Sequence, residues 1–356
     1  MEQKSVLIGM SGGVDSSVAA ALLKEQGYHV IGATMRLWTY SDSCNMKHEG
    51  CCAESAVEDA RRVCDKLGID FYVMNFKDMF KDKVVDYFVD EYIHGRTPNP
   101  CIACNKYLKF DALLKKALAM GIDYVATGHY AKIEKGEDGK YILRASEAVK
   151  KDQSYVLYNF TQEQLAHTLM PLGVYNKDWV RQKAEELGLG VAHKPDSQEI
   201  CFVEDDDYAK FIPDYSGYKP KEGDILDVNG NVIGKHRGLI YYTIGQRKGI
   251  GAYGRPMFVM KIDAENNTIT LGEKGMEFSN ELTAYDVNFV SGEFPKENML
   301  ITAKVRYQAP PAAAMLCPQK DGTVKLMFPE PQRAVTPGQA VVFYDGDIVL
   351  GGGTVL

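Results

Sequence analysis

The stretch 5-SVLIGMSGGVDSSVAAALLKEQG-27 contains the signals that decide the fold of the first part of the chain. A short apolar run is followed by a loop of glycines and serines, and then by an Ala/Leu-rich helical pattern that ends at Gly27. A second apolar run, HVIGATMRL, begins at His29. Strand, glycine loop, helix and strand in this order form a βαβ unit, which predicts a parallel sheet.

The same alternation of helix and strand patterns continues to about residue 205. We expect helices at 53–68, 78–94, 106–121, 161–170 and 177–188, and strands at 70–75 and 124–131. Beyond Tyr208, short β-like runs such as LIYYTIG (239–245) alternate with Gly, Asn-Gly, Asp-Gly and Pro turns. The sequence therefore predicts an α/β domain at 1–205 and two small β modules, at 206–280 and 281–356.

Length and composition indicate a globular protein. A chain of 356 residues favours two or three domains, and no apolar stretch approaches the roughly 18 residues of a membrane span. The first residues do not resemble a signal peptide, so we expect a cytoplasmic protein with no membrane partner, whose eight cysteines are mostly reduced. The net charge of −7 disfavours a protein that binds nucleic acid through its overall electrostatic attraction, but it allows a local basic groove that binds nucleic acid.

The loop GMSGGVDSS at 9–17 lies where a phosphate-binding loop belongs, after a strand and at a helix N-terminus. Backbone N–H groups and the helix dipole hold anions there, and serine hydroxyls add donors. The loop lacks the Gly-Lys-Ser/Thr of a Walker motif, which weakens the case for transfer of a γ-phosphoryl group. It resembles the loop of the PP-loop ATP pyrophosphatases, enzymes that transfer AMP to a carbonyl oxygen. That resemblance implies ATP contacts at Gly9, Met10, Ser11, Gly12, Gly13, Val14, Asp15 and Ser16, and at Met35 and Gly128 near the ends of later strands.

Three cysteines occur in distinctive local sequences. The turn TPNPCIACN (97–105) delivers Cys101 and Cys104 at C-x-x-C spacing, and Cys201 lies in HKPDSQEICF. A zinc site normally has four ligands, and the sequence has no second C-x-x-C to provide the fourth. A thioredoxin-like pair needs no upstream phosphate loop. The third alternative is sulfur chemistry, in which a persulfide on one cysteine attacks an activated carbon and another cysteine resolves the S–S bond.

Six ordered motifs together resemble one family. GMSGGVDSS, GRTPNPC-x-x-CN, ATGHYA, KKDQSYVLY, PDSQEICF and GQRKGIG are similar to the tRNA-specific 2-thiouridylases, the MnmA/TrmU group. The resemblance implies a PP-loop domain, a small central domain and a C-terminal β-barrel. It also implies that Mg-ATP adenylates the C2 carbonyl oxygen of the wobble uridine in tRNAs for lysine, glutamate and glutamine. Cys201 then receives sulfur as a persulfide from a desulfurase or carrier protein, and Cys104 acts as nucleophile or resolving thiol, with a Cys104–Cys201 disulfide as an intermediate.

The resemblance also implies a set of tRNA contacts. An amide side chain offers a donor and an acceptor to a base, basic groups suit phosphate, and an aromatic ring can stack. The family positions that match are Asn99, Pro100, His129, Lys151, Asp152, Gln153, Arg306, Tyr307 and Gln339.

One position departs from the family. Well-known members carry Asp where this chain has Cys101, and a thiol does not inherit the role of a carboxylate. A trio of cysteines raises a second hypothesis, a 4Fe-4S cluster held by Cys101, Cys104 and Cys201 in place of the persulfide relay. Another PP-loop adenylating ligase is the rival enzyme class, but it needs no cysteine pair.

Overall fold

The computed structural model describes residues 3–38, 54–195, 200–203 and 206–356. Its first domain is built on a five-stranded sheet in the order β3-β2-β1-β4-β7, in which every pairing is parallel. This confirms the predicted βαβ unit and parallel sheet. The strands are β1 (Ser5–Gly9), β2 (His29–Arg36), β3 (Asp70–Asn75), β4 (Tyr124–Ala126) and β7 (Thr168–Leu169).

Strand order determines where this sheet can bind a ligand. The chain moves outward from β1 to β2 and β3, then returns to add β4 on the other side of β1. The carboxyl ends of β1 and β4 therefore flank the switch point, which is where open parallel sheets bind ligands.

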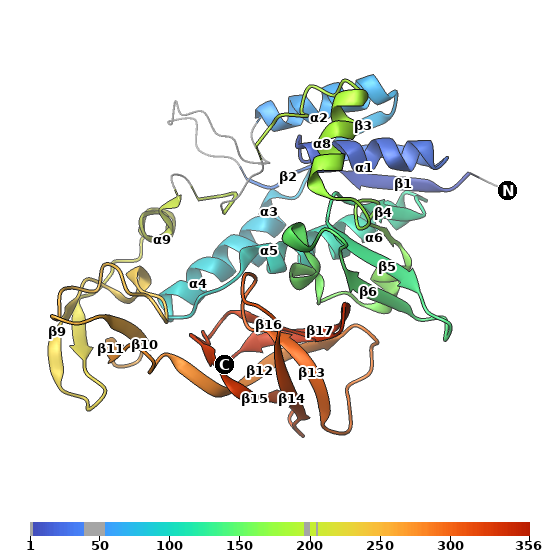
Figure 1. Cartoon of the computed structure of the whole chain (residues 1–356). Helices are drawn as coiled ribbons and strands as arrows, with labels where there is room; N and C mark the ends of the chain where they lie inside the picture. Colours follow the sequence, from blue (N-terminus) through green and yellow to red (C-terminus); the bar gives the residue numbers. More distant parts are fainter. Residues whose placement is uncertain (1–2, 39–53, 196–199, 204–205) are drawn as a thin grey trace.

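Helices pack against the sheet (Figure 1). Helix α1 (Val14–Glu25) follows β1 and buries a run of small residues that includes Ala19 and Ala20, which lets α8 (Lys177–Glu186) pack beside it. Helix α2 (Glu54–Leu67) lies next to β2 and β3. The short elements of this domain are η3 (Val149–Lys151), η4 (Ser154–Leu157) and α7 (Gln162–Ala166).

Two long helical stretches contain π-helical segments. The helix predicted at 78–94 consists of α3 (Lys77–Phe80), the π-helix η1 (Lys81–Asp86) and α4 (Tyr87–Ile93). The helix predicted at 106–121 begins earlier, as α5 (Pro100–Ala103), the π-helix η2 (Cys104–Ala112) and α6 (Leu113–Ala119). Because Asn99 and Pro100 start a helix, both cysteines of the C-x-x-C are helical and do not lie in a turn.

Two predictions of strands were wrong. The run 124–131 is not one strand, because β4 ends at Ala126 and a loop precedes β5 (Ala131–Lys135). The run 239–245 contains the 3-10 helix η6 (Leu239–Tyr241). Leu239 and Tyr242 pack in one core and Ile240 in another, and a spacing of three residues suits a 3-10 turn better than the alternation of a strand.

The second half of the chain is β-rich, as predicted. Helix α9 (Tyr208–Ser216) leads into a four-stranded sheet in the order β10-β11-β8-β9. Beyond it, β12 pairs with both β15 and β17, which closes the strands β12-β15-β14-β13-β16-β17 into a barrel. The strands are β8 (Gly223–Leu226), β9 (Val232–His236), β10 (Met257–Asp263), β11 (Thr268–Glu273), β12 (Phe278–Phe289), β13 (Met299–Lys304), β14 (Ala312–Pro318), β15 (Val324–Arg333), β16 (Ala340–Asp345) and β17 (Ile348–Val355).

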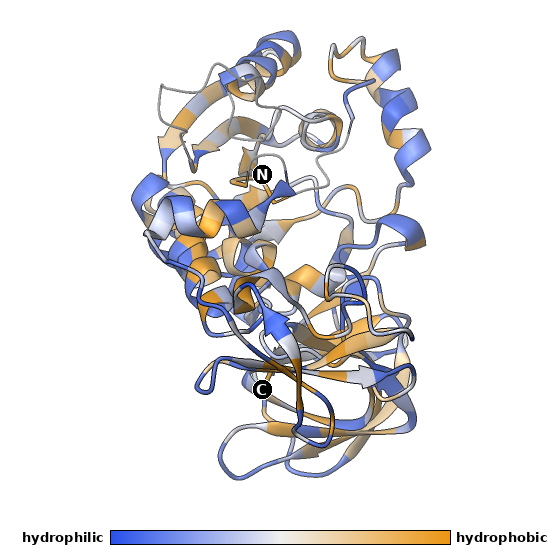
Figure 2. Ribbon diagram, turned by 90° about the vertical axis from the view of Figure 1, so that its left-hand side faces the viewer, coloured by the Kyte–Doolittle hydropathy of each residue, from blue (hydrophilic) through white to orange (hydrophobic). Residues whose placement is uncertain are grey.

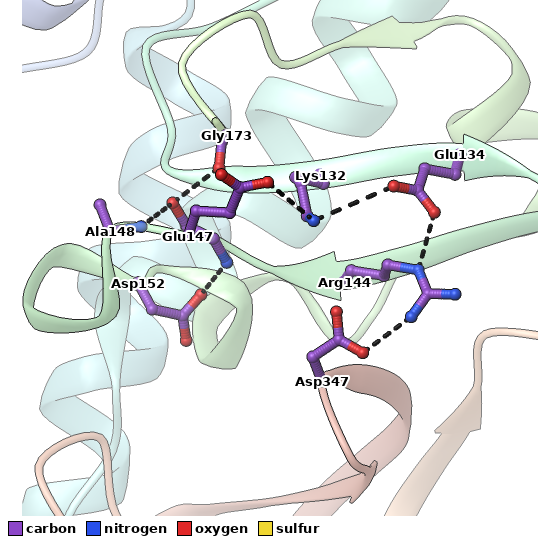
Figure 3. A network of polar contacts seen from close by, with 9 residues as sticks. Lys132, Glu134, Arg144, Glu147, Ala148, Asp152, Gly173 and Asp347 are labelled. Carbon is purple, nitrogen blue, oxygen red and sulfur yellow. Dashed lines mark hydrogen bonds and ion pairs between the residues drawn. The ribbon is translucent and has the colours of Figure 1, made fainter. Parts of the chain in front are cut away.

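A hairpin from the first domain joins the barrel. Strands β5 and β6 (Tyr141–Ala145) pair with each other, and Arg144 pairs with Ile348 on β17. The Arg144 guanidinium lies 2.7 Å from Asp347 on the barrel and 2.8 Å from Glu134 on β5 (Figure 3). The barrel is therefore anchored to the β5–β6 hairpin of the first domain.

The domains also share an apolar core. One buried cluster combines Phe88 and Leu108 of the first domain with Val342 and Val349 of the barrel. Figure 2 shows apolar residues on the strands and inner helices, whereas many outer loops are hydrophilic. Across the described ranges, no helix combines the length and apolar character that crossing a membrane requires.

Candidate active site

The loop between β1 and α1 is shaped to accept an anion. Gly12 has φ +69°, and a Cβ there would lie 2.3 Å from the carbonyl oxygen of Ala56, so only glycine fits. The Ser16 hydroxyl accepts a hydrogen bond from the Ser11 N–H (3.2 Å), and the Ser17 hydroxyl donates to the Gly13 carbonyl (2.8 Å). Gly13 at the N-cap has no side chain to cap the helix, which leaves the first N–H groups of α1 to a ligand.

Asp15 lies at the mouth of this loop in a network of partly buried polar groups. The Lys177 Nζ lies 2.8 Å from both Asp15 carboxylate oxygens, and the Tyr130 hydroxyl donates to Oδ1 at 2.7 Å. Lys194 donates to the Gly12 carbonyl (3.1 Å) and to Asp59 (2.9 Å). Two lysines therefore bring positive charge to the loop, where a polyphosphate would need it.

These lysines and Tyr130 were missed by sequence reasoning. Lys177 begins the predicted helix at 177–188 but belongs to none of the motifs considered above. The packing of α8 against α1 is what brings it to Asp15. Only a topological argument, that helices on one face of a parallel sheet lie side by side, could have identified it.

The loop after β4 completes the switch point. A Cβ on Gly128 would lie 2.7 Å from the Ser16 backbone nitrogen, so this loop touches the phosphate loop directly. His129 Nδ1 lies 2.7 Å from the Thr127 hydroxyl, and burial, with a smaller effect of Lys109, lowers the pKa of His129 well below its ordinary value. His129 is therefore neutral at pH 7. Met35 lies half-buried near the carboxyl end of β2.

The C-x-x-C segment presents its two thiols differently. The Asn99 side chain caps α5 by accepting from the N–H groups of Cys101 (3.1 Å) and Ile102 (3.4 Å). Cys101 is exposed, whereas Cys104 is only 7% exposed and belongs to the shared core. Cys201 is half-buried and packs against that same core.

Cys201 is held by its neighbour in sequence. Phe202 is 1% exposed and makes edge-on ring contacts with Phe80 (5.7 Å) and Phe88 (5.2 Å), and a tilted contact with Trp38 (6.4 Å). The preceding residues of the PDSQEICF motif, 196–199, lie outside the described residues.

The structure does not test the cluster hypothesis. Among the described residues, no group of three or more His, Cys, Asp and Glu side chains is placed to hold a metal ion. The 4Fe-4S cluster on Cys101, Cys104 and Cys201 therefore stays a prediction.

Several predicted tRNA contacts form a chain of hydrogen bonds between the barrel and the phosphate loop. The Tyr307 hydroxyl donates to the Asp152 carbonyl (3.0 Å). Gln153 Oε1 accepts from the Tyr130 N–H (2.9 Å), and Tyr130 in turn reaches Asp15. The Asp152 carboxylate accepts from the Ser146 N–H (2.9 Å) (Figure 3).

The other predicted tRNA contacts lie at domain boundaries. Gln339 donates to the Thr97 carbonyl (2.7 Å), which ties the barrel to the TPNP segment. Arg306 donates from one nitrogen to the carbonyls of Ile244 (3.1 Å) and Ala334 (2.6 Å), so its guanidinium joins the central domain to the barrel. Lys151 ends η3, beside Asp152.

A parallel sheet ordered 3-2-1-4-7, with a glycine and serine loop at its switch point and a carboxylate at the loop mouth, defines a PP-loop nucleotide-binding domain. Three family models cover the chain, described as tRNA methyl transferase HUP domain (4–205), tRNA methyl transferase PRC-barrel domain (209–273) and aminomethyltransferase beta-barrel domain (279–355).

Full-length relatives identify the family. The chain is 59% identical to the tRNA-specific 2-thiouridylase MnmA of Acetivibrio thermocellus, over 100% of both chains. It is 58% identical to that of Clostridioides difficile, over 99% of this chain and 98% of the relative. A solved 4-thiouridine synthetase–RNA complex with bound ATP matches 54% of this chain and 43% of its own, at 18% identity and a TM-score of 0.36. The protein belongs to the tRNA-specific 2-thiouridylase family.

Proposed function

We propose that this protein is an ATP-dependent tRNA sulfurtransferase that replaces the C2 oxygen of a wobble uridine with sulfur. The observation that carries the proposal is a chain of hydrogen bonds between the phosphate loop and the barrel. Tyr130 bonds to Asp15 and to Gln153, and the neighbouring Asp152 accepts from Tyr307 on the barrel. These bonds hold the phosphate loop and the barrel, which we propose contacts the RNA, in a fixed relation. Family membership supports tRNA as the substrate.

The first step activates the uracil. An amide carbonyl is a poor electrophile, so its oxygen must become a leaving group before sulfur can attack. We assign the N–H groups of the loop, with Lys177 and Lys194, to the phosphates of Mg-ATP, and Asp15 at the loop mouth to the substrate's Mg²⁺. The carbonyl oxygen attacks the α-phosphorus, pyrophosphate leaves, and the uridine becomes O-adenylated at C2.

The second step transfers sulfur. The terminal sulfur of a Cys201 persulfide attacks C2, and AMP leaves with the electron pair of the C–O bond. A thiolate, assigned to Cys104, then attacks the Cys201 sulfur, breaking the S–S bond and releasing 2-thiouridine. The two cysteine thiols are oxidised to a disulfide as the persulfide sulfur is reduced, and an external thiol restores them. A desulfurase or sulfur-carrier protein supplies the persulfide sulfur.

Cys104 is 7% exposed in the core against which Cys201 packs. We propose that the start of η2 moves when RNA binds and brings its thiol to the Cys201 sulfur. Cys104 is the first residue of that π-helix, a form that is rare and often found at functional sites. Cys101 is exposed beside it and is a second thiol to test.

RNA recognition completes the proposal. The target base must leave the stack of the anticodon loop to reach the cysteines, which costs less in a loop than in a duplex. We assign tRNAs for lysine, glutamate and glutamine as substrates, and the cytoplasm as the compartment.

The test is formation of 2-thiouridine in a wobble-uridine tRNA transcript with Mg-ATP and a sulfur source. A parallel reaction contains S-adenosylmethionine instead of ATP, since two family models carry the description tRNA methyl transferase. Formation of 2-thiouridine only in the reaction that contains ATP supports the proposal. Formation of methylated uridine in the reaction with S-adenosylmethionine would instead indicate a methyltransferase.

A further inference from the structure

A pocket of about 400 Å³ lies between the first domain and the barrel and has no part in the reaction described above. Asn99, Ile102 and Lys106 line it from the cysteine-bearing helix, whereas Cys101, Cys104 and the phosphate loop do not. Its volume is in the range of pockets for small molecules.

The walls of this pocket are built from unusual backbone. Asp82 and Lys83 come from the π-helix η1, and Lys106 and Tyr107 from the π-helix η2. Asp286, on the barrel side, has φ +47° at a register shift of β12. Backbone in rare conformations persists where it serves a site, so five residues of one pocket in such conformations point to a ligand.

The lining combines aromatic rings with hydrogen-bonding groups. Four tyrosines line the pocket: Tyr87, Tyr107, Tyr158 and Tyr285. Tyr107 is 37% exposed. Burial raises the pKa of Tyr87, and the three other tyrosines lie close enough to raise it further. The Asn159 side chain also lines the pocket, where its buried amide interacts with the Tyr158 hydroxyl. Lys106 pairs with Asp286 at 2.7 Å, so the charges at the pocket are balanced.

We propose that this pocket binds a second, unmodified nucleobase of the RNA, a close neighbour of the target uridine in the anticodon loop; this rests on the proposed function. Tyrosine rings suit the face of a base, and amide and carboxylate groups suit its edge, whereas balanced charge does not suit a phosphate. Cys101 lies on α5, and residues of α5 and η2 line the pocket. The pocket and the Cys101 thiol are therefore separated by about the 10 Å width of a helix, a distance that adjacent nucleotides can span. Asn99 lines the pocket and caps the helix at Cys101, so an occupied pocket helps to fix the thiol-bearing turn.

The test uses full-length protein and tRNA transcripts in which each non-target anticodon-loop nucleotide is made abasic in turn. We expect one abasic position to weaken binding to the wild-type protein about tenfold, as loss of one stacked base does. Tyr107→Ala should weaken binding of intact tRNA to the same extent, and should show no further loss with that abasic tRNA. Tyr107→Phe, which keeps the ring, should retain most of the affinity.

Controls separate this proposal from the proposed function. Tyr72→Ala removes an exposed tyrosine on β3, far from the pocket in sequence and fold, and should bind like wild type. If every abasic tRNA affects Tyr107→Ala and wild type equally, the pocket does not hold a base, and the inference is overturned. If wild type binds tRNA as expected here but forms no 2-thiouridine, the proposed function fails while the pocket remains.

Discussion

Lys177 and Asp15 form a two-pronged ion pair at the mouth of the phosphate loop, with the lysine nitrogen 2.8 Å from each carboxylate oxygen. The Lys177 side chain is 12% exposed and the Asp15 side chain 31% exposed, so the pair is partly buried. In this arrangement the lysine neutralises a carboxylate that would otherwise repel a polyphosphate. The arrangement makes Lys177 part of the nucleotide site, although it lies 162 residues from Asp15 in sequence.

Replacing Lys177 therefore tests the nucleotide site. Lys177→Ala should lower the ATP-dependent release of pyrophosphate in the presence of tRNA by about 100-fold, as loss of one charge-stabilising group typically does. Lys183→Ala is the matched control, since Lys183 lies on the same helix but pairs with Glu25 on α1 at 2.9 Å. If both variants retain wild-type rates, Lys177 has no role at the phosphates.

Gly128 tests the close approach of the two loops. Its backbone does not require glycine, but a methyl group would lie 2.7 Å from the Ser16 nitrogen, so Gly128→Ala should push the phosphate loop out of shape. We expect at least tenfold weaker ATP binding by calorimetry. Gly190→Ala, at a glycine with nothing within 4 Å of the added Cβ, should bind ATP normally. Equal affinities for the two variants would contradict the packing of these loops.

The thiols should differ in their reactivity with pH. Burial raises the pKa of Cys64 to about 12, so at pH 8 only about one thiol in ten thousand is the reactive thiolate. Alkylation with iodoacetamide, followed by peptide mass spectrometry, should modify exposed Cys101 rapidly and leave Cys64 unmodified until the pH approaches 12. Modification of Cys64 at pH 8 at the rate of Cys101 would contradict its burial.

Arg306 should contribute to stability across a domain boundary. Arg306→Ala removes hydrogen bonds to two carbonyls and should lower the free energy of unfolding by about 3 kcal/mol in urea titrations. The salt dependence of tRNA binding separates this structural role from the predicted tRNA contact, because hydrogen bonds within the protein release no counterions from the RNA. Tyr307→Phe, which removes one hydroxyl from the next residue, should cost about 1 kcal/mol. A salt slope lower by about one for Arg306→Ala would instead indicate a phosphate contact.

The parts of the fold that depend on local sequence were predictable. The loop at 9–17 lies between a strand and a helix as expected, because apolar runs, glycines and helix formers all act over a few residues. The turn predicted at 97–105 is instead a helix start, because the Asn99 side chain and Pro100 together form an N-cap.

Contacts between residues far apart in the sequence, and the burial of individual helical residues, could not be predicted from the sequence. Lys177, Lys194 and Tyr130 reach the loop only through tertiary packing. The burial of Cys104 could not be read from C-x-x-C spacing, because it depends on packing against a core to which the barrel also contributes.

The predicted tRNA contacts remain predictions. The described side chains of Asp152, Gln153 and Gln339 make hydrogen bonds within the protein, which gives each of them a structural role as well. Sequence similarity alone cannot separate the two roles, because both would preserve the same residue.

The central claim is tested most directly by an assay of the product. Protein purified without oxygen is incubated with a wobble-uridine tRNA transcript, Mg-ATP, and a cysteine desulfurase with cysteine, and the digested nucleosides are analysed by mass spectrometry. The account predicts 2-thiouridine in equal amount to AMP, none without ATP, and none with Cys201→Ser. Absence of 2-thiouridine with every sulfur source, in a preparation that still binds ATP and tRNA, would contradict it.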